Sequence, residues 1–206
     1  MLLVLQQQPT KLQFKKLVTS KILDFWHSKI LEDIEQKRSL RFLRGNFLPL
    51  GKGPHPLWLS CGDSESAIEA AIINAKILSG RYRDDYLISK WNSNTSGCCM
   101  SKNCSFFPGD VTHYLSGNCS ALSSQLNLTL TCSLNILSHF PYLVEPVISA
   151  RRKSAEEWAA FLLNPITNPQ LIKISQEFDP TAIWPVFRLT RAYIWTMHRE
   201  RMNSIE

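Results

Sequence analysis

A cluster of cysteines around one histidine is the part of this sequence whose residue types could do chemistry. Residues 98–119 hold four of the six cysteines, and four side chains follow the pattern Cys-x4-Cys-x8-His-x5-Cys: Cys99, Cys104, His113 and Cys119. Three thiols and an imidazole are donors that hold a structural Zn²⁺ in a tetrahedron. The pattern predicts a small zinc-knuckle loop over residues 98–119. Because Cys98 directly precedes Cys99, the sequence leaves the first ligand open between these two residues.

Two other fates of these cysteines stay open at this point, namely disulfides in a secreted domain and inert buried thiols. Four Asn-x-Ser/Thr sequons would suit a glycosylated secreted domain: Asn94, Asn103, Asn118 and Asn127. Against secretion, the apolar run at the N-terminus covers only residues 1–5, whereas a signal peptide needs about seven to fifteen apolar residues. We therefore expect an intracellular protein, nuclear or cytoplasmic, in which paired thiols bind metal more readily than they oxidise.

The composition limits the classes of function. The chain has 206 residues, of which 44% are hydrophobic, so it can build a core in one large or two small domains. No apolar stretch approaches the roughly 20 residues needed to cross a bilayer, and we expect no membrane partner. The formal net charge of +6 permits RNA or DNA as a partner without requiring it. The sequence also lacks a Gly-rich phosphate loop and a nucleophile elbow, so we expect no catalytic site.

The elements that must position the knuckle loop are predicted to be helices. The expected fold class is mainly α, with helical bundle-like segments flanking a small zinc-knuckle loop. Residues 1–63 are predicted to form an N-terminal helix and a connector rich in proline and glycine. Residues 64–140 form a helical region with the knuckle, and residues 141–206 form a C-terminal helical region.

The first helix is expected between Lys11 and Arg44, with Gly45 as its C-terminal stop. Four apolar residues at steps of three and four are predicted to share one face of it: Leu23, Trp26, Ile30 and Ile34. In the connector, Trp58 is expected to pack against the helix that follows.

Start signals mark three of the later helices. Ser-x-x-Glu capping boxes predict helix starts at Ser66–Glu69 and Ser154–Glu157, and Asp179-Pro180 is predicted to open the last helix. Residues 122–137 fit the periodicity of a strand as well as that of a helix. We favour a helix there, because the neighbouring segments are helical.

We interpret a short acidic string and the two remaining cysteines as structural residues and not as parts of a functional site. Tyr82-Arg83-Asp84-Asp85 matches the metal-binding string of a polymerase palm, which must sit at the tip of a β-hairpin. Here it follows a helix that ends at Gly80, so we interpret both aspartates as first-turn charges of the next helix. Cys61 and Cys132 have no partner at ligand spacing and are interpreted as buried thiols.

The last helix combines an apolar face with a flank of basic and aromatic side chains. The apolar face is predicted from the spacing of Ile183, Phe187, Ile194 and Met197. The flank could hold a nucleic-acid strand by charge and stacking, or it could be a packed face on which arginine stems cover tryptophan rings. The candidate nucleic-acid contacts, one of them in the knuckle loop, are Lys102, Arg188, Arg191, Trp195 and Arg199.

Several strings, taken in order, resemble a known type of polyprotein region. They are Pro54-His55-Pro56-Leu57-Trp58, Ile77-Leu78-Ser79-Gly80-Arg81-Tyr82-Arg83, Gly97-Cys98-Cys99 through Cys104, His113-Tyr114-Leu115, Cys119, Phe161-Leu162-Leu163-Asn164-Pro165, Leu189-Thr190-Arg191-Ala192-Tyr193 and His198-Arg199-Glu200-Arg201-Met202. Over about residues 20–203 the chain resembles the region downstream of the reverse transcriptase in polyproteins of animal non-LTR (LINE-type) retrotransposons.

This resemblance implies a non-catalytic tail with a Cys-Cys-His-Cys zinc-binding motif that helps to hold template RNA or target DNA. Carried over residue by residue, the ligands would be Cys99, Cys104, His113 and Cys119, and Cys98 departs from the pattern. The upstream reverse transcriptase domain would be a partner in a full-length element, and this chain would be a truncated or remnant copy. The alternative that the residues leave open is a helical scaffold or protein-interaction segment with a purely structural zinc clip.

Overall fold

The computed structural model describes residues 9–43, 56–62, 64–99, 101, 104 and 107–203. Within these residues the chain is built from helices and turns, and β pairing is limited to one antiparallel bridge between Cys98 and Pro108. The prediction of a mainly α fold is confirmed.

The α-helices are short, apart from the first and the last. Their bounds are α1 Lys11–Gln36, α2 Pro56–Leu59, α3 Glu65–Leu78, α4 Asp85–Trp91, α5 Val111–Leu115, α6 Ser123–Leu137, α7 Pro141–Arg151, α8 Ala155–Leu163, α9 Pro169–Glu177 and α10 Trp184–Asn203. The 3₁₀ turns among the described residues are η1 Arg38–Leu43, η3 Pro165–Thr167 and η4 Pro180–Ile183.

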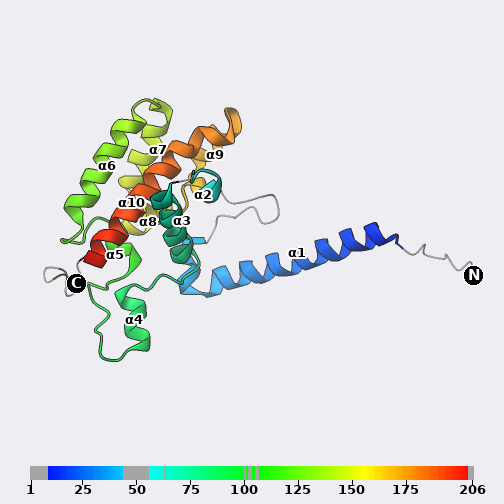
Figure 1. The fold of residues 1–206 in the computed structure, drawn as a ribbon, viewed down its shortest axis with the longest axis horizontal. Coiled ribbons are helices and arrows are strands. Elements are labelled where there is room, and N and C mark those ends of the chain that lie inside the picture. Colours follow the sequence, from blue (N-terminus) through cyan, green and yellow to red (C-terminus); the bar gives the residue numbers. More distant parts are fainter. Residues whose placement is uncertain are drawn as a thin grey trace, which may run out of the picture.

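Helix α10 is the central element of the helical body (Figure 1). It packs against α3, α6 and α8, and the predicted apolar face is buried, with Phe187, Ile194 and Met197 inaccessible to solvent. One hydrophobic core joins side chains from Ile34 to Met197. Residues of all three predicted regions therefore contribute to the same core.

Helix α1 extends away from this body (Figure 1). The predicted apolar face packs only at its C-terminal end, where Ile34 is buried and Ile30 lies against the core. The rest of the face is open to solvent, since Leu23 and Trp26 are 51% and 57% exposed. The helix ends at Gln36, and the predicted stop at Gly45 lies outside the described residues.

Two of the three predicted helix starts are confirmed. The Ser154–Glu157 capping box is present at the start of α8, and the Asp179 side chain accepts a hydrogen bond from Thr181 N at the start of η4, which leads into α10. The third prediction was wrong by two residues, because Ser64 and not Ser66 caps α3.

Two further expectations meet different outcomes. The segment that fitted both periodicities is helix α6, so the prediction of a helix is confirmed. Trp58 is 44% exposed, whereas the neighbouring Leu57 is buried. The buried apolar side chain of α2 is therefore Leu57 and not the expected Trp58.

A buried polar network joins α4, α5 and α10. The Arg201 guanidinium donates a hydrogen bond of 2.7 Å to Asp85 Oδ1, and the Tyr114 hydroxyl donates to the other carboxylate oxygen. Arg201 also lies over the rings of Tyr82 and Tyr114, 5.6 and 5.5 Å from their centroids. Gly109 passes so close that an added Cβ would lie 2.8 Å from Asp85 Cβ. Asp85 is therefore a buried ion-pair partner rather than a simple first-turn charge.

Asp84 lies, as predicted, at the start of the next helix, α4. Its Oδ1 atom accepts a hydrogen bond from Leu87 N and caps α4, while Oδ2 accepts one from Val111 N at the start of α5. Burial raises the pKa of this carboxyl, and the two backbone donors oppose that rise. Both aspartates of the palm-like string thus serve the packing of two short helices.

Replacing Asp85 by Asn should destabilise the fold by about 3–5 kcal/mol, because it leaves the Arg201 charge buried without a counter-charge. Urea denaturation of the purified chain measures the loss. Glu177→Gln is the matched control, since it breaks an exposed pair with Lys173 and should change stability little. Equal effects of the two substitutions would contradict this interpretation of the network.

Candidate metal centre

The first two cysteines of the cluster lie on a loop that folds back on itself. Cys99 N donates to Phe107 O at 2.9 Å, and Gly109 N donates to Gly97 O at 3.0 Å, which closes the two sides of the loop around the single β bridge. Cys104 sits between them in a turn, where its N–H donates to Ser101 O at 2.8 Å. These backbone hydrogen bonds thus bring Cys99 and Cys104, five positions apart in the sequence, to the same side of the loop.

The other two members of the cluster lie within helix α5 and in the turn after it. Asp110 caps this helix by accepting a hydrogen bond of 2.9 Å from His113 N, which places the imidazole in its first turn. The chain then turns through Gly117, whose φ of 76° favours glycine. Cys119 follows, and its carbonyl accepts hydrogen bonds from the residues that begin α6. A short capped helix and a turn therefore position both side chains.

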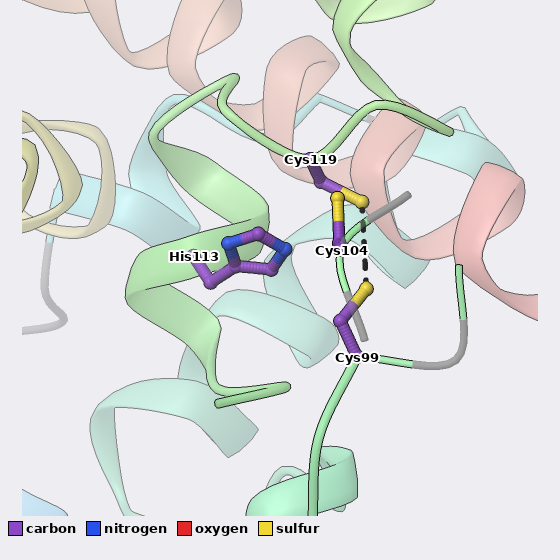
Figure 2. Close-up of side chains that lie close together, drawn as sticks. All are labelled: Cys99, Cys104, His113 and Cys119. Carbon is purple, nitrogen blue, oxygen red and sulfur yellow. Dashed lines mark hydrogen bonds between the residues drawn. The ribbon is translucent and has the colours of Figure 1, made fainter. Parts of the chain in front are cut away.

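The four predicted side chains converge on one point (Figure 2). Their ligand atoms all lie within 4.8 Å of one another, and the Cys99 and Cys119 Sγ atoms are 3.7 Å apart. Sulfurs that share a tetrahedral Zn²⁺ at about 2.3 Å lie about 3.8 Å from each other. Cys99, Cys104, His113 and Cys119 are therefore close enough to hold a metal ion.

The cluster contains a buried nitrogen that the protein does not satisfy. His113 Nε2 is inaccessible to solvent and has no hydrogen-bond partner, and in Figure 2 a nitrogen of this ring faces the three sulfurs. An unpaired buried polar atom costs free energy, whereas coordination to a cation would use its lone pair. The donor set and this orphaned atom both fit a metal ion.

The structure distinguishes the two adjacent cysteines. Cys99 is buried within the cluster, whereas the Cys98 thiol contacts Ser96 O at 3.9 Å outside it. All six cysteines lie in described parts of the chain and are free thiols. Cys99 is therefore the candidate first ligand.

The electrostatic environment differs among the four groups. Burial raises the pKa of the Cys119 thiol to about 12. Burial also acts to raise the pKa of Cys104, but hydrogen bonds from the hydroxyl and the N–H of Ser120 more than offset it and the pKa is lowered. The pKa of His113 is lowered by burial against the opposing charge of Asp110. The imidazole is thus held neutral, the form that binds metals.

Arg41 is a neighbour of the cluster that sequence reasoning missed. Its guanidinium reaches from η1 to Thr112 Oγ1 at 2.7 Å and to Asp110 Oδ2 at 3.3 Å, and so holds the start of α5. About 70 residues separate the partners along the chain, and no local pattern signals such a contact.

The predicted nucleic-acid contacts differ in exposure, although Arg188, Arg191 and Trp195 line one cavity. Arg188 and Arg199 are exposed and Trp195 is half-buried, whereas Lys102 lies outside the described residues. Arg191 is only 3% exposed, and its guanidinium donates hydrogen bonds to Ser60 and to the Leu57 carbonyl. The assignment of Arg191 as a nucleic-acid contact was therefore wrong.

The two remaining cysteines are not buried as expected. Cys132 is exposed and Cys61 is half-buried. Helix α6 turns Leu126, Leu130 and Leu137 towards the core, and Cys132 lies on its outer side. The interpretation of both as buried thiols was wrong, and for Cys132 it weighed the residue type and not the position on the helix.

Comparisons of this chain with models of protein families, with curated proteins and with solved structures find no match. Among the described residues, no helix has both the length and the apolar character needed to cross a membrane. The feature of this chain that bears on its function is therefore the geometry of the Cys/His cluster.

Metal affinity should rise with pH. The Cys119 thiol, with its raised pKa, is protonated near neutrality, so an incoming cation must displace its proton. Each thiol proton released contributes roughly a tenfold gain in affinity per pH unit. Titration with Co²⁺ at several pH values between about 6 and 8, followed by its thiolate charge-transfer absorption, measures this slope. An affinity independent of pH would show that the thiols are not the ligands.

Proposed function

We propose that this chain is a non-catalytic helical module in which Cys99, Cys104, His113 and Cys119 bind one structural Zn²⁺. The observation that carries the proposal is the orphaned His113 Nε2 beside three thiols within one small volume. Three sulfurs and one nitrogen in a closed tetrahedral arrangement are typical of structural zinc sites, whereas magnesium and calcium prefer oxygen ligands. All four candidate positions are supplied by the protein, as in sites that stabilise a fold.

The ion would act as a cross-link between three short segments. The cysteine-bearing loop, α5 and the turn before α6 are three short segments, and zinc contributes about 10–16 kcal/mol to the folding of small fingers. The cross-link would be connected to the helical body through Tyr114, the residue after His113. The Tyr114 hydroxyl donates a hydrogen bond to Asp85. Helix α5 also packs against α8. In this proposal, zinc fixes the orientation of α5 on the helical body.

The purified chain should contain one Zn²⁺ per molecule, measured by plasma mass spectrometry. Cys99→Ser and Cys119→Ser should each abolish stoichiometric zinc, because three remaining donors hold the ion far more weakly. Cys98→Ser and Cys132→Ser are the matched controls and should retain it, since neither thiol belongs to the cluster. A protein without zinc, or loss of zinc from the Cys98 variant alone, would contradict the proposal.

Nucleic-acid binding is a second candidate function, and one cavity favours it. Arg188 and Trp195 line an open cavity of about 460 Å³ together with Ser64, which caps α3. The first turn of a helix presents free N–H groups and a positive dipole end that favour phosphates. A base could stack on the tryptophan while a backbone phosphate meets the arginine and the helix start.

This second candidate agrees with the resemblance to the tail of a retrotransposon polyprotein. In such a polyprotein the module would lie beside an upstream reverse transcriptase domain and hold RNA or DNA near it. The net charge of +6 is compatible with this role. The alternative is a helical scaffold that packs against protein and contacts no polynucleotide.

Arg188→Gln should weaken binding of single-stranded RNA and lower the slope of log affinity against log salt by about 0.7, the value for one lost phosphate contact. Fluorescence anisotropy at low and raised KCl measures both quantities. Arg152→Gln, at another exposed arginine outside the cavity, is the control and should change binding less. Absence of binding at low salt, in protein that retains its zinc, would reject this candidate and leave the zinc proposal intact.

A further inference from the structure

The open cavity between α10 and the start of α3 is positively charged. Its volume of about 460 Å³ is within the range of small-molecule sites. Arg188 and Arg191, three residues apart on α10, line it, and its described lining contains no carboxylate. Glu65, at the start of α3, is exposed and does not belong to that lining. The remaining lining residues are uncharged.

The charge of Arg191 is buried without a counter-charge. This residue is 3% exposed, and its guanidinium donates hydrogen bonds to neutral acceptors, namely the carbonyls of Leu57 and Ser60 and the Ser60 hydroxyl. Burial lowers the pKa of Arg191, and the like charge of Arg188 adds to this effect. Within the described part of the chain, neither arginine forms an ion pair. Because a buried charge is ordinarily paired, the two arginines favour an anionic ligand in the cavity.

Other groups around the cavity can donate hydrogen bonds to such an anion. Arg188 is exposed, and a guanidinium binds a phosphate group through two parallel N–H donors. Ser64 and Ser66 line the cavity from the start of α3, where the positive end of the helix dipole also favours an anion. Arg191 would therefore act through its charge, while Arg188 and the two serines make the contacts.

We propose that this cavity binds the phosphate monoester of a nucleotide, in preference to a phosphate diester. A monoester carries a charge of about −1.5 to −2 near neutral pH, which matches two guanidinium groups. An internal phosphate of RNA or DNA carries a single negative charge and would leave one of the two uncompensated. Trp195, half-buried in the lining, offers its ring to the base. The ligand is a nucleotide with a terminal phosphate, either free or at the end of a strand.

This inference rests on the same cavity as the nucleic-acid candidate, but the two can fail separately. A strand held along its backbone is bound through internal phosphates, whatever group stands at its end. A monoester site distinguishes a terminal phosphate from a terminal hydroxyl and also binds a single nucleotide. Binding of RNA that is indifferent to the terminal phosphate, without binding of a mononucleotide, would uphold the nucleic-acid candidate and overturn this inference.

Isothermal titration calorimetry of the purified chain at low salt tests the preference. We expect adenosine 5′-monophosphate to bind at least about tenfold more tightly than adenosine or the diester adenylyl-adenosine. Arg188→Gln should remove most of this difference, whereas Arg152→Gln, at an exposed arginine outside the cavity, is the matched control and should retain it.

A second pair of variants changes the charge of the cavity from the side of α3. Ser66→Asp should weaken binding of adenosine 5′-monophosphate at least about tenfold, because a carboxylate in the lining repels the phosphate. Ser66→Asn is the matched neutral control and should retain binding. An acidic residue in the first turn is compatible with a helix, and circular dichroism checks that both variants keep their helical content.

Two short RNA strands of the same sequence, one with a 5′-phosphate and one with a 5′-hydroxyl, distinguish the sources of the monoester. Tighter binding of the phosphorylated strand assigns the ligand to a strand end, whereas equal binding of the two strands, with the mononucleotide still bound, assigns it to a free nucleotide.

Three results would overturn the proposal: no binding of adenosine 5′-monophosphate, equal affinity for the monoester and the diester, and binding unchanged in Arg188→Gln. Asp63, next to Ser64 in the sequence, lies outside the described residues. A gain in affinity of about tenfold or more in Asp63→Asn would show that the arginines already have a counter-charge, and would also overturn the proposal.

Discussion

The arrangement of the middle of this chain depends on four lone-pair donors that meet in a space closed to water. Three thiols and one imidazole nitrogen lie within 4.8 Å of one another, and the nitrogen has no partner within the protein. Such a group of donors is costly while it is left uncompensated and strongly stabilising once a cation fills it. The proposal of a structural zinc ion follows from this asymmetry rather than from the spacing of the cysteines alone.

The cluster is connected to the helical body by polar contacts as well as by the apolar packing of Val111 and Leu115 in the core. Tyr114, which follows the candidate ligand His113, donates to Asp85, and Asp85 is held in turn by Arg201 at the end of α10. From the other side, Arg41 holds Asp110, the residue that caps α5. A change in the Cys/His cluster would therefore alter contacts with α10 on one side and with η1 on the other.

The sequence predicted those features that depend on local chemistry. The zinc-ligand pattern identified the four residues that converge, because each lies in a short segment whose own turns and caps place it. The capping box at Ser154 was predicted for the same reason, whereas the helix at residues 122–137 was predicted from its helical neighbours, because its periodicity fitted a strand as well. Where two serines lie two residues apart, as at Ser64 and Ser66, the local pattern alone could not rank them.

Features that depend on tertiary contacts were missed or mistaken. Arg191 was expected to contact nucleic acid, but the folded chain buries it against Leu57 and Ser60, which lie more than 130 residues away in the sequence. The choice between Cys98 and Cys99 needed the backbone pairing with Phe107. The partners Arg41 and Asp110 are far apart in the chain, and only the folded structure brings them together.

X-ray absorption at the zinc edge of the freshly purified chain tests the central claim most directly, because it reports the atoms bound to the ion. We expect a single zinc environment with three sulfur neighbours at about 2.3 Å and one nitrogen neighbour at about 2.0 Å. A shell made only of oxygen and nitrogen, a shell of four sulfurs, or protein that contains no zinc would contradict it.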